Sequence, residues 1–241
     1  MDPFSFPPIS ALLSAVYWFV QGIATLIEPV TGGASAALAV VLLTLLVRVL
    51  LIPVGVSQVK AEWTRRRLAP KLAALQAKHR KNPELLQRKI AALYKAEKAS
   101  PFAGIGPALA QAPVVSLVYA LFVHGTIGGH ANLLLAASLG GVPLGASFVT
   151  VGITWPGVLV FVGLLGLIAL TAWLTRRSTL RLATPDAASA RLGAVLSWLP
   201  FLTVVFAAIV PLAATIYLAT TTAWTLVERA LLRRRYWVSA G

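Results

Sequence analysis

The chain has 241 residues, of which 58% are hydrophobic and 12% are charged, with a net charge of +14 and a mean hydropathy of +0.82. Soluble domains carry about 25% charged residues, so this composition excludes an ordinary soluble protein and indicates an all-α polytopic membrane protein. The chain has no cysteine, which excludes a disulfide framework, a zinc-thiolate site and a lipid-anchored cysteine.

Residues 9–28 form the first apolar segment. Its polar residues recur at helical spacing and form one stripe, opposite a stripe of apolar residues, which is typical of a helix lying in the membrane interface. The polar stripe is Ser10, Ser14, Gln21, Thr25 and Glu28, and the apolar stripe is Leu12, Val16, Phe19, Ile23 and Ile27. We expect an interfacial helix on the outer surface, with a membrane-spanning helix as the alternative.

The remaining segments follow from the length of a membrane helix, which needs about 20 apolar residues to cross the bilayer core. We predict an outer N-terminal segment, five transmembrane helices, a helical hairpin and polar connections. In chain order these are the N-terminal segment 1–33, helix 34–58, hairpin 59–103, helix 104–124, outer loop 125–154, helix 155–175, cytoplasmic loop 176–191, helices 192–209 and 211–231, and cytoplasmic tail 232–241.

The basic residues orient these segments. Every one of the 21 Lys and Arg residues except Arg48 lies in one of three blocks, at residues 60–98, 176–191 and 229–235. Lys and Arg accumulate in cytoplasmic loops. The blocks therefore predict a multi-pass membrane protein with its N-terminus outside and its C-terminus in the cytoplasm.

The first block predicts a cytoplasmic helical hairpin. Asn82 is a suitable N-cap and Pro83 a suitable first residue for the second helix, while Pro70 is expected to start or kink the first. The charge of the hairpin suits contact with anionic headgroups of the membrane surface. We assign such headgroup contact to Arg176, Arg177, Arg181 and Arg191.

Arg48 is the exceptional basic residue, because it lies among apolar residues in the first predicted span. A charge at the centre of a membrane helix costs about 2.5–3.5 kcal/mol on insertion-derived scales. Lys60, the next basic residue, is about 18 Å further along a helix. Two readings remain open: Arg48 reaches the headgroups from a helix end unwound at Pro53 and Gly55, or it lies in a water-filled cavity open to the cytoplasm.

Other polar residues favour the cavity. They are Thr44, one turn before Arg48, Gln111 between two prolines in the second span, and Tyr217, Thr220, Thr221 and Thr222 in the last. Each threonine alone is more simply explained by a bond to its own helix. No acidic residue lies well inside a span, and Glu228 falls at the cytoplasmic end of the last, which leaves Arg48 without an intramembrane counter-ion.

Recognisable catalytic chemistry is absent from the sequence. The three histidines are scattered, and we find no HExxH, GxSxG or Gly-rich phosphate loop. We therefore expect no enzyme activity, no catalytic residue, no metal and no cofactor.

Several stretches resemble the YidC family of membrane protein insertases. They are TLLVRVLLIPVGVSQVK, LAPKLAALQAKHRKNPELLQRKIAALYKAEKASPFAGIGPALAQAPVVSLVYALF and FAAIVPLAATIYLATTTAWTLVERALL. The resemblance implies five transmembrane helices around a hydrophilic groove that is open to the cytoplasm and the lipid. It also implies groove roles for Arg48, Thr44, Gln111 and Tyr217, beside which we place Thr221 and Thr222, and a location in a bacterial plasma membrane. The resemblance further implies that the basic hairpin receives nascent chains or ribosomes, a reading that we favour over headgroup contact alone. The candidate receiving residues are Lys71, Lys78, Arg80, Lys81, Arg88 and Lys89.

This resemblance predicts a membrane protein insertase or chaperone, with an anion- or lipid-handling channel as the alternative. The implied partners are newly made membrane proteins and anionic lipids, with the ribosome and the Sec translocon as further candidates. We expect a monomer and no sequence-specific nucleic acid. The chain departs from the usual family pattern at Leu218, Thr222, Glu228 and Ser100, which leaves its clients open.

Overall fold

The computed structural model describes residues 6–100, 116–181 and 193–238, and this part of the chain is mostly helical. The long helices are α1 (Pro7–Thr31), α2 (Ser35–Leu50), α3 (Ile52–His79), α4 (Pro83–Ala96), α8 (Gly157–Arg181), α10 (Leu199–Ile209) and α11 (Leu212–Val238). Residues 116–123 are also helical. The predicted groove residue Gln111, the predicted headgroup contact Arg191 and most of the predicted span 104–124 lie outside the described residues.

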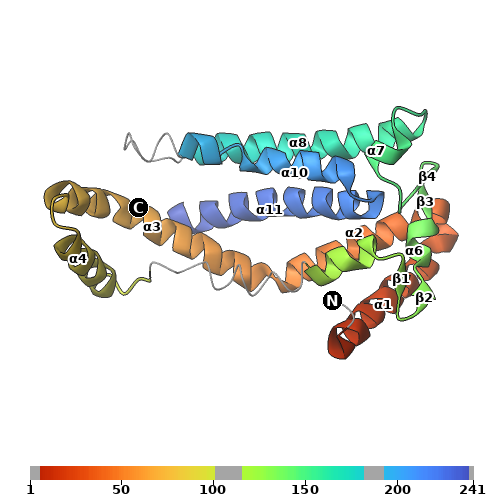
Figure 1. Cartoon of the computed structure of the whole chain (residues 1–241), viewed down its shortest axis with the longest axis horizontal. Helices are drawn as coiled ribbons and strands as arrows, with labels where there is room; N and C mark the ends of the chain where they lie inside the picture. The colour runs from red at the N-terminus through yellow and green to blue at the C-terminus, as the bar shows by residue number, and fades with distance from the viewer. Residues whose placement is uncertain (1–5, 101–115, 182–192, 239–241) are drawn as a thin grey trace.

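The helices α2, α8, α10 and α11 run side by side along the long axis of the molecule (Figure 1). α11 is the central one, because it packs against α8, α2, α3 and α10. α3 continues past the end of this bundle, and α4 folds back from the far end of α3 (Figure 1). We call this end of the bundle, which carries the described basic residues 60–98, 176–181 and 229–235, the basic end.

Two stretches of helix in the described residues are long and apolar enough to cross a membrane. They are Pro7–Leu50, which joins α1 and α2 through a short 3-10 turn at Gly32–Ala34, and Gly157–Arg181, while Gly193–Ile209 is shorter. Figure 1 shows α1 and α2 as the arms of a V. The turn needs Gly32, whose φ of 54° is unfavourable for residues with a Cβ.

The face of α1 that packs against the rest of the protein differs from the predicted apolar stripe. Leu13, Tyr17, Val20 and Ala24 are buried, whereas Leu12, Trp18, Phe19 and Leu26 are exposed. α1 therefore buries a narrow face against its neighbours and presents large apolar side chains outward. Such a surface suits lipid, and whether α1 lies on or crosses the membrane stays a prediction.

Residues 125–152, predicted as an outer loop, form a structured cap at the end of the bundle opposite the basic end (Figure 1). The cap holds the strand pairs β1 (Thr126–Ile127) with β2 (His130–Ala131) and β3 (Ser138–Leu139) with β4 (Val142–Pro143), and the single-turn helices α6 (Leu133–Ala136) and α7 (Phe148–Val151). Both hairpins turn on Gly-Gly pairs with positive φ, as two-residue type I′ turns require.

Hydrogen bonds fasten this cap to the helices. Asn132, which is 5% exposed, donates to the carbonyls of Leu121 and His124 at 2.7 and 3.0 Å. The backbone N–H groups of Leu212 and Ala213 donate to carbonyls of the cap at 2.7 and 2.9 Å. Buried polar groups need such partners, so the cap is a continuous part of the core.

The helix expected over residues 34–58 is divided in two. α2 ends at Leu50, Leu51 is the junction, and α3 begins at Ile52. Pro53 explains the break, because its ring clashes with the preceding turn and it has no N–H to donate. α3 then continues through Pro70 to His79, so Pro70 neither starts a helix nor ends one.

The hairpin of α3 and α4 follows the sequence prediction at its turn. The Asn82 side chain accepts a hydrogen bond from the Leu85 N–H at 3.1 Å, and Pro83 is the first residue of α4. At the other end of α4, the Glu97 carboxylate pairs with Lys71 and, at 2.7 Å, with Arg67. The hydrogen bond from Lys71 is the largest influence that holds the pKa of Glu97 below its usual value.

Candidate functional site

A small cavity lies where α2, α3 and α11 meet, toward the basic end of the bundle. Its volume is about 30 Å³, enough for a water molecule. The lining residues are Arg48, Leu51, Gly55, Gln58, Thr225, Glu228, Arg229 and Leu232. The site thus gathers two arginines, a carboxylate, an amide and a hydroxyl where the apolar helix α2 ends and the basic helix α3 begins.

Arg48 enters this cavity from the last turn of α2. Its side chain is half-buried, while the neighbouring Val49 and Leu50 are exposed. The end of a helix carries unpaired carbonyls and a partial negative charge, which favours a cation in the last turn. The break between α2 and α3 therefore supplies one local reason why an arginine is tolerated here.

Glu228 supplies the opposite charge in the cavity. Its Oε2 accepts a hydrogen bond from the Trp224 indole N–H at 3.0 Å, one turn earlier on α11. Its Oε1 is one of the few buried side-chain atoms of the described residues with no hydrogen-bond partner. Glu228 and Arg48 line the same cavity, although the ion pairs within 4.0 Å in this part of the chain do not join them.

Gly55 makes room for this carboxylate. A Cβ at position 55 would lie 2.0 Å from Glu228 Oε1, closer than any real contact allows. A residue larger than glycine there would therefore push the carboxylate out of its present position.

The predicted groove residues fall into two groups. Arg48 lines the cavity, whereas Thr44 is 1% exposed and donates to the Val40 carbonyl at 2.7 Å. Tyr217 is 3% exposed and belongs to the apolar core.

The two predicted groove threonines lie on α11. Thr222 donates to the Leu218 carbonyl at 2.9 Å, and Thr221 Oγ1 is buried with no partner among the described residues. Among the described residues of this set, Arg48 alone lines the cavity, and Thr44 and Tyr217 are packed in the protein.

Four polar lining residues were not singled out as site residues by the sequence reasoning. They are Gln58, Thr225, Glu228 and Arg229. A signal existed for two of them, since Thr225 and Glu228 follow Thr221 at spacings of four and seven residues and share its helix face. Gln58 carries no comparable signal, because its position depends on how α3 leaves the break at Leu51.

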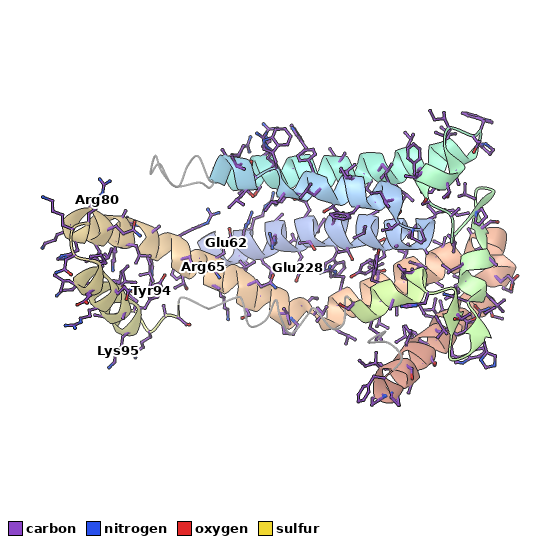
Figure 2. The ribbon with its side chains drawn as sticks, viewed as in Figure 1. Glu62, Arg65, Arg80, Tyr94, Lys95 and Glu228 are labelled. Carbon is purple, nitrogen blue, oxygen red and sulfur yellow. The ribbon has the colours of Figure 1, made fainter. Side chains whose placement is uncertain are left out.

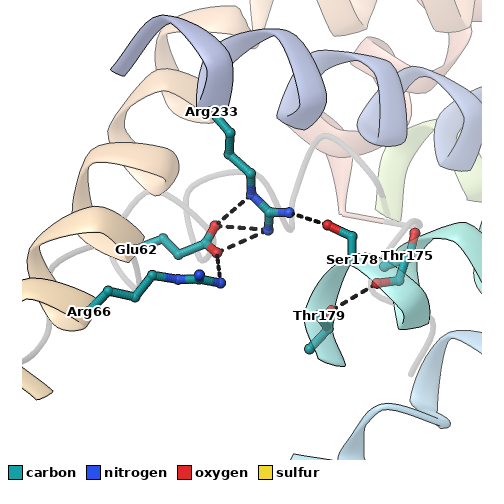
Figure 3. A network of polar contacts seen from close by, with 6 residues as sticks. All are labelled: Glu62, Arg66, Thr175, Ser178, Thr179 and Arg233. Carbon is teal, nitrogen blue, oxygen red and sulfur yellow. Dashed lines mark hydrogen bonds and ion pairs between the residues drawn. The ribbon is translucent and has the colours of Figure 1, made fainter. Parts of the chain in front are cut away.

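An ion-pair network ties the helices together at the basic end, next to this cavity (Figure 3). Arg233 of α11 donates two hydrogen bonds of 3.0 Å from Nη2 to the Glu62 carboxylate of α3, and one of 2.7 Å from Nη1 to the Ser178 hydroxyl of α8. Arg66 donates to the same carboxylate at 2.9 Å. Glu62 therefore sits between two guanidinium groups from different helices.

Replacing Glu62 by glutamine is expected to destabilise the protein by about 1–3 kcal/mol, because Arg66 and Arg233 would lose a shared, partly buried carboxylate. Thermal unfolding of the full chain in detergent measures this, with Glu84→Gln on the exposed surface of α4 as the control that removes the same charge. An equal change in melting temperature for both variants would mean that the network contributes nothing specific.

The predicted receiving residues of the hairpin are at its surface. Lys71, Lys78, Arg80, Lys81, Arg88 and Lys89 are all exposed, and Figure 2 shows the labelled Arg80 at the tip, far from Glu228. Lys71 is paired with Glu97. The hairpin thus presents most of its charge outward, beyond the end of the bundle.

These features define a helical membrane protein with a polar cavity between apolar helices. Residues 26–238 match the model of the family described as 60Kd inner membrane protein. The match covers most of the chain, so the protein belongs to this family, which is the YidC family. It is therefore a polytopic membrane protein.

Individual relatives agree with this assignment. The membrane protein insertase YidC of Clostridium perfringens is 31% identical over 115 residues, which is 48% of each chain. YidC of Zymomonas mobilis is 28% identical over 181 residues, 73% of this chain and 30% of that protein. The inner membrane ALBINO3-like protein 2 of Chlamydomonas reinhardtii is 34% identical over 112 residues, 46% of this chain and 26% of that protein. The chain spans about half the length, or less, of these relatives.

Proposed function

We propose that the protein is a membrane protein insertase that moves short polar ends of client helices across the membrane and helps the clients fold. The observation that carries this proposal is Arg48, which lines a polar cavity between apolar helices of a YidC-family chain. The clients are newly made membrane proteins. The proposal treats the basic end as cytoplasmic, because Lys and Arg accumulate on that side.

The groove of this proposal begins at the cavity around Arg48 and widens toward the cytoplasm, within a core of five spans at 34–58, 104–124, 155–175, 192–209 and 211–231. The structured cap supports closure on the outer side, since it is hydrogen-bonded to the helices there. A client tail in the groove has less hydrocarbon to cross than one that enters bare lipid.

Electrostatics and burial supply the two steps of the mechanism. Arg48 attracts a negatively charged client tail, and this attraction is stronger between apolar walls than in bulk water. The apolar client segment then leaves sideways along an exposed apolar face beside the cavity, such as that of Leu42, Val49 and Leu50 on α2. Burial of apolar surface at about 25 cal/mol per Å² is sufficient to drive this step.

The hairpin of α3 and α4 is proposed to receive clients before they reach Arg48. Its exposed Lys and Arg residues lie beyond the bundle end, where an emerging chain or a ribosome arrives first. The Sec translocon is a candidate partner for larger clients.

Water access to position 48 tests the proposal directly. The chain has no cysteine, so Arg48→Cys introduces a single thiol. We expect a membrane-impermeant maleimide to label this thiol from the cytoplasmic side, in inverted vesicles, and not from the outside.

Leu46→Cys is the matched control. Leu46 is 44% exposed on the same helix, two residues away, on a surface that faces lipid in this proposal, so its thiol should resist the reagent. Equal labelling of position 48 from both sides would indicate a pore and favour the channel alternative. The absence of labelling from either side would refute a water-filled groove at this position.

A further inference from the structure

A second and larger cavity lies on the other side of α11, between the basic ends of α8 and α11. Its volume is about 720 Å³, within the range of small-molecule binding sites. The residues that line it form one face of each helix: Leu174, Thr175, Ser178, Thr179 and Arg181 on α8, and Thr225, Leu226, Arg229, Ala230, Arg233 and Arg234 on α11. The two helices therefore present matching faces without filling the space between them.

The lining combines cations with apolar side chains. Four arginines line the cavity. One of them, Arg233, is hydrogen-bonded to Glu62 and Ser178. The cations that remain for an incoming anion are Arg181, Arg229 and Arg234. Of the two acids nearby in the described part of the chain, Glu62 is engaged by guanidinium groups and Glu228 lines the neighbouring cavity around Arg48. The cavity thus has an excess of positive charge above an apolar wall made by Leu174, Leu226 and Ala230.

The hydrogen bonding of the hydroxyl groups in the lining indicates that the cavity suits an anion and not a cation. Thr179 and Thr225 donate to carbonyls of their own helices at 2.9 and 2.8 Å, so they offer little more than an apolar methyl. Ser178 accepts from Arg233, and its own proton takes no part in that bond. The cavity therefore presents an O–H donor and guanidinium forks, which is the donor set that a phosphate accepts from.

We propose that this cavity binds a phosphate group and that the phosphate belongs to an anionic phospholipid. The apolar wall is the reason to choose a lipid over a free phosphate. Exposed apolar residues lie next to it in the sequence of the same helices, Leu170 one turn before Leu174 and Leu231 beside Ala230, and offer surface for acyl chains. Basic pockets between membrane helices on the cytoplasmic side are suited to such headgroups. The cavity shares Thr225 and Arg229 with the cavity around Arg48, while its other lining residues differ. Lipid retention there can be measured without insertase activity.

Native mass spectrometry of the full chain released from phosphatidylcholine nanodiscs that contain phosphatidylglycerol tests this site. The wild-type chain should retain phosphatidylglycerol in preference to phosphatidylcholine. Arg181→Gln combined with Arg234→Gln should weaken this retention by about thirtyfold, since each of the two basic residues near the surface contributes about five- to sixfold. Ala230→Trp fills the cavity without changing charge and should reduce retention as well.

The control is Lys95→Gln combined with Lys98→Gln, which removes the same charge from two exposed positions outside the proposed receiving residues and should leave retention unchanged. Equal losses in both double variants, or unchanged retention in Ala230→Trp, would overturn the site. Inorganic phosphate in excess should not displace the lipid. If it does, and also binds the chain in pure phosphatidylcholine, the lipid assignment is overturned in favour of a soluble phosphate compound.

Discussion

Replacing Arg48 by alanine is expected to lower the insertion of a single-span client with an acidic translocated tail by about tenfold. Two opposite charges 4 Å apart attract by about 4 kcal/mol at an effective dielectric constant of 20. Water and the nearby Glu228 carboxylate reduce this attraction, and a remainder of about 1.4 kcal/mol corresponds to a factor of ten. The measurement is protease protection of the client tail in proteoliposomes that contain the purified protein.

The same client with a neutral tail is the control, and its insertion should change little, because the alanine variant loses charge attraction and not the apolar exit path. Arg48→Lys keeps the charge and loses the planar fork, so it should restore most of the activity if the attraction is electrostatic. Insertion of the acidic-tailed client at the wild-type level by Arg48→Ala would refute the role of Arg48.

Local features of this structure were predictable from the sequence because they depend on neighbouring residues. The Asn82 cap and the start of α4 at Pro83 follow from backbone donors that only a few side chains satisfy. The end of α10 before Pro211 is also local in origin, because a proline disfavours helical backbone at the residue before it, here Val210. Arg48 could be singled out from the sequence as a candidate site residue, because a lone charge in an apolar segment is costly whatever surrounds it.

The surroundings of Arg48 were not predictable, because they depend on how distant helices meet. Glu228 is 180 positions further along the chain and was placed at the end of its span, with no indication that α11 brings it to α2. Thr44 and Tyr217 were assigned to the groove, whereas the structure buries both. Periodicity gives the face of a helix that a residue occupies, and it does not say which neighbour that face meets.

The Glu228 carboxylate is expected to compete with acidic clients for Arg48, so Glu228→Gln should raise insertion of the acidic-tailed client several-fold. Glutamine has nearly the same shape and can still accept the Trp224 hydrogen bond through its amide oxygen. The change therefore removes charge from the cavity with little effect on packing. Glu84→Gln, on the exposed face of the hairpin, is the matched control and should leave insertion unaltered.

Two further variants separate competition from a general effect of charge. Gly55→Ala places a Cβ where the Glu228 carboxylate now lies, so it should displace that carboxylate and raise insertion without changing any charge. In Arg48→Ala combined with Glu228→Gln, the gain from Glu228→Gln should disappear, since the carboxylate then has no arginine to neutralise. Coupling between neighbouring residues amounts to about 0.5–3 kcal/mol, which the insertion assay resolves. Additive effects of the two substitutions would mean that Glu228 acts independently of Arg48.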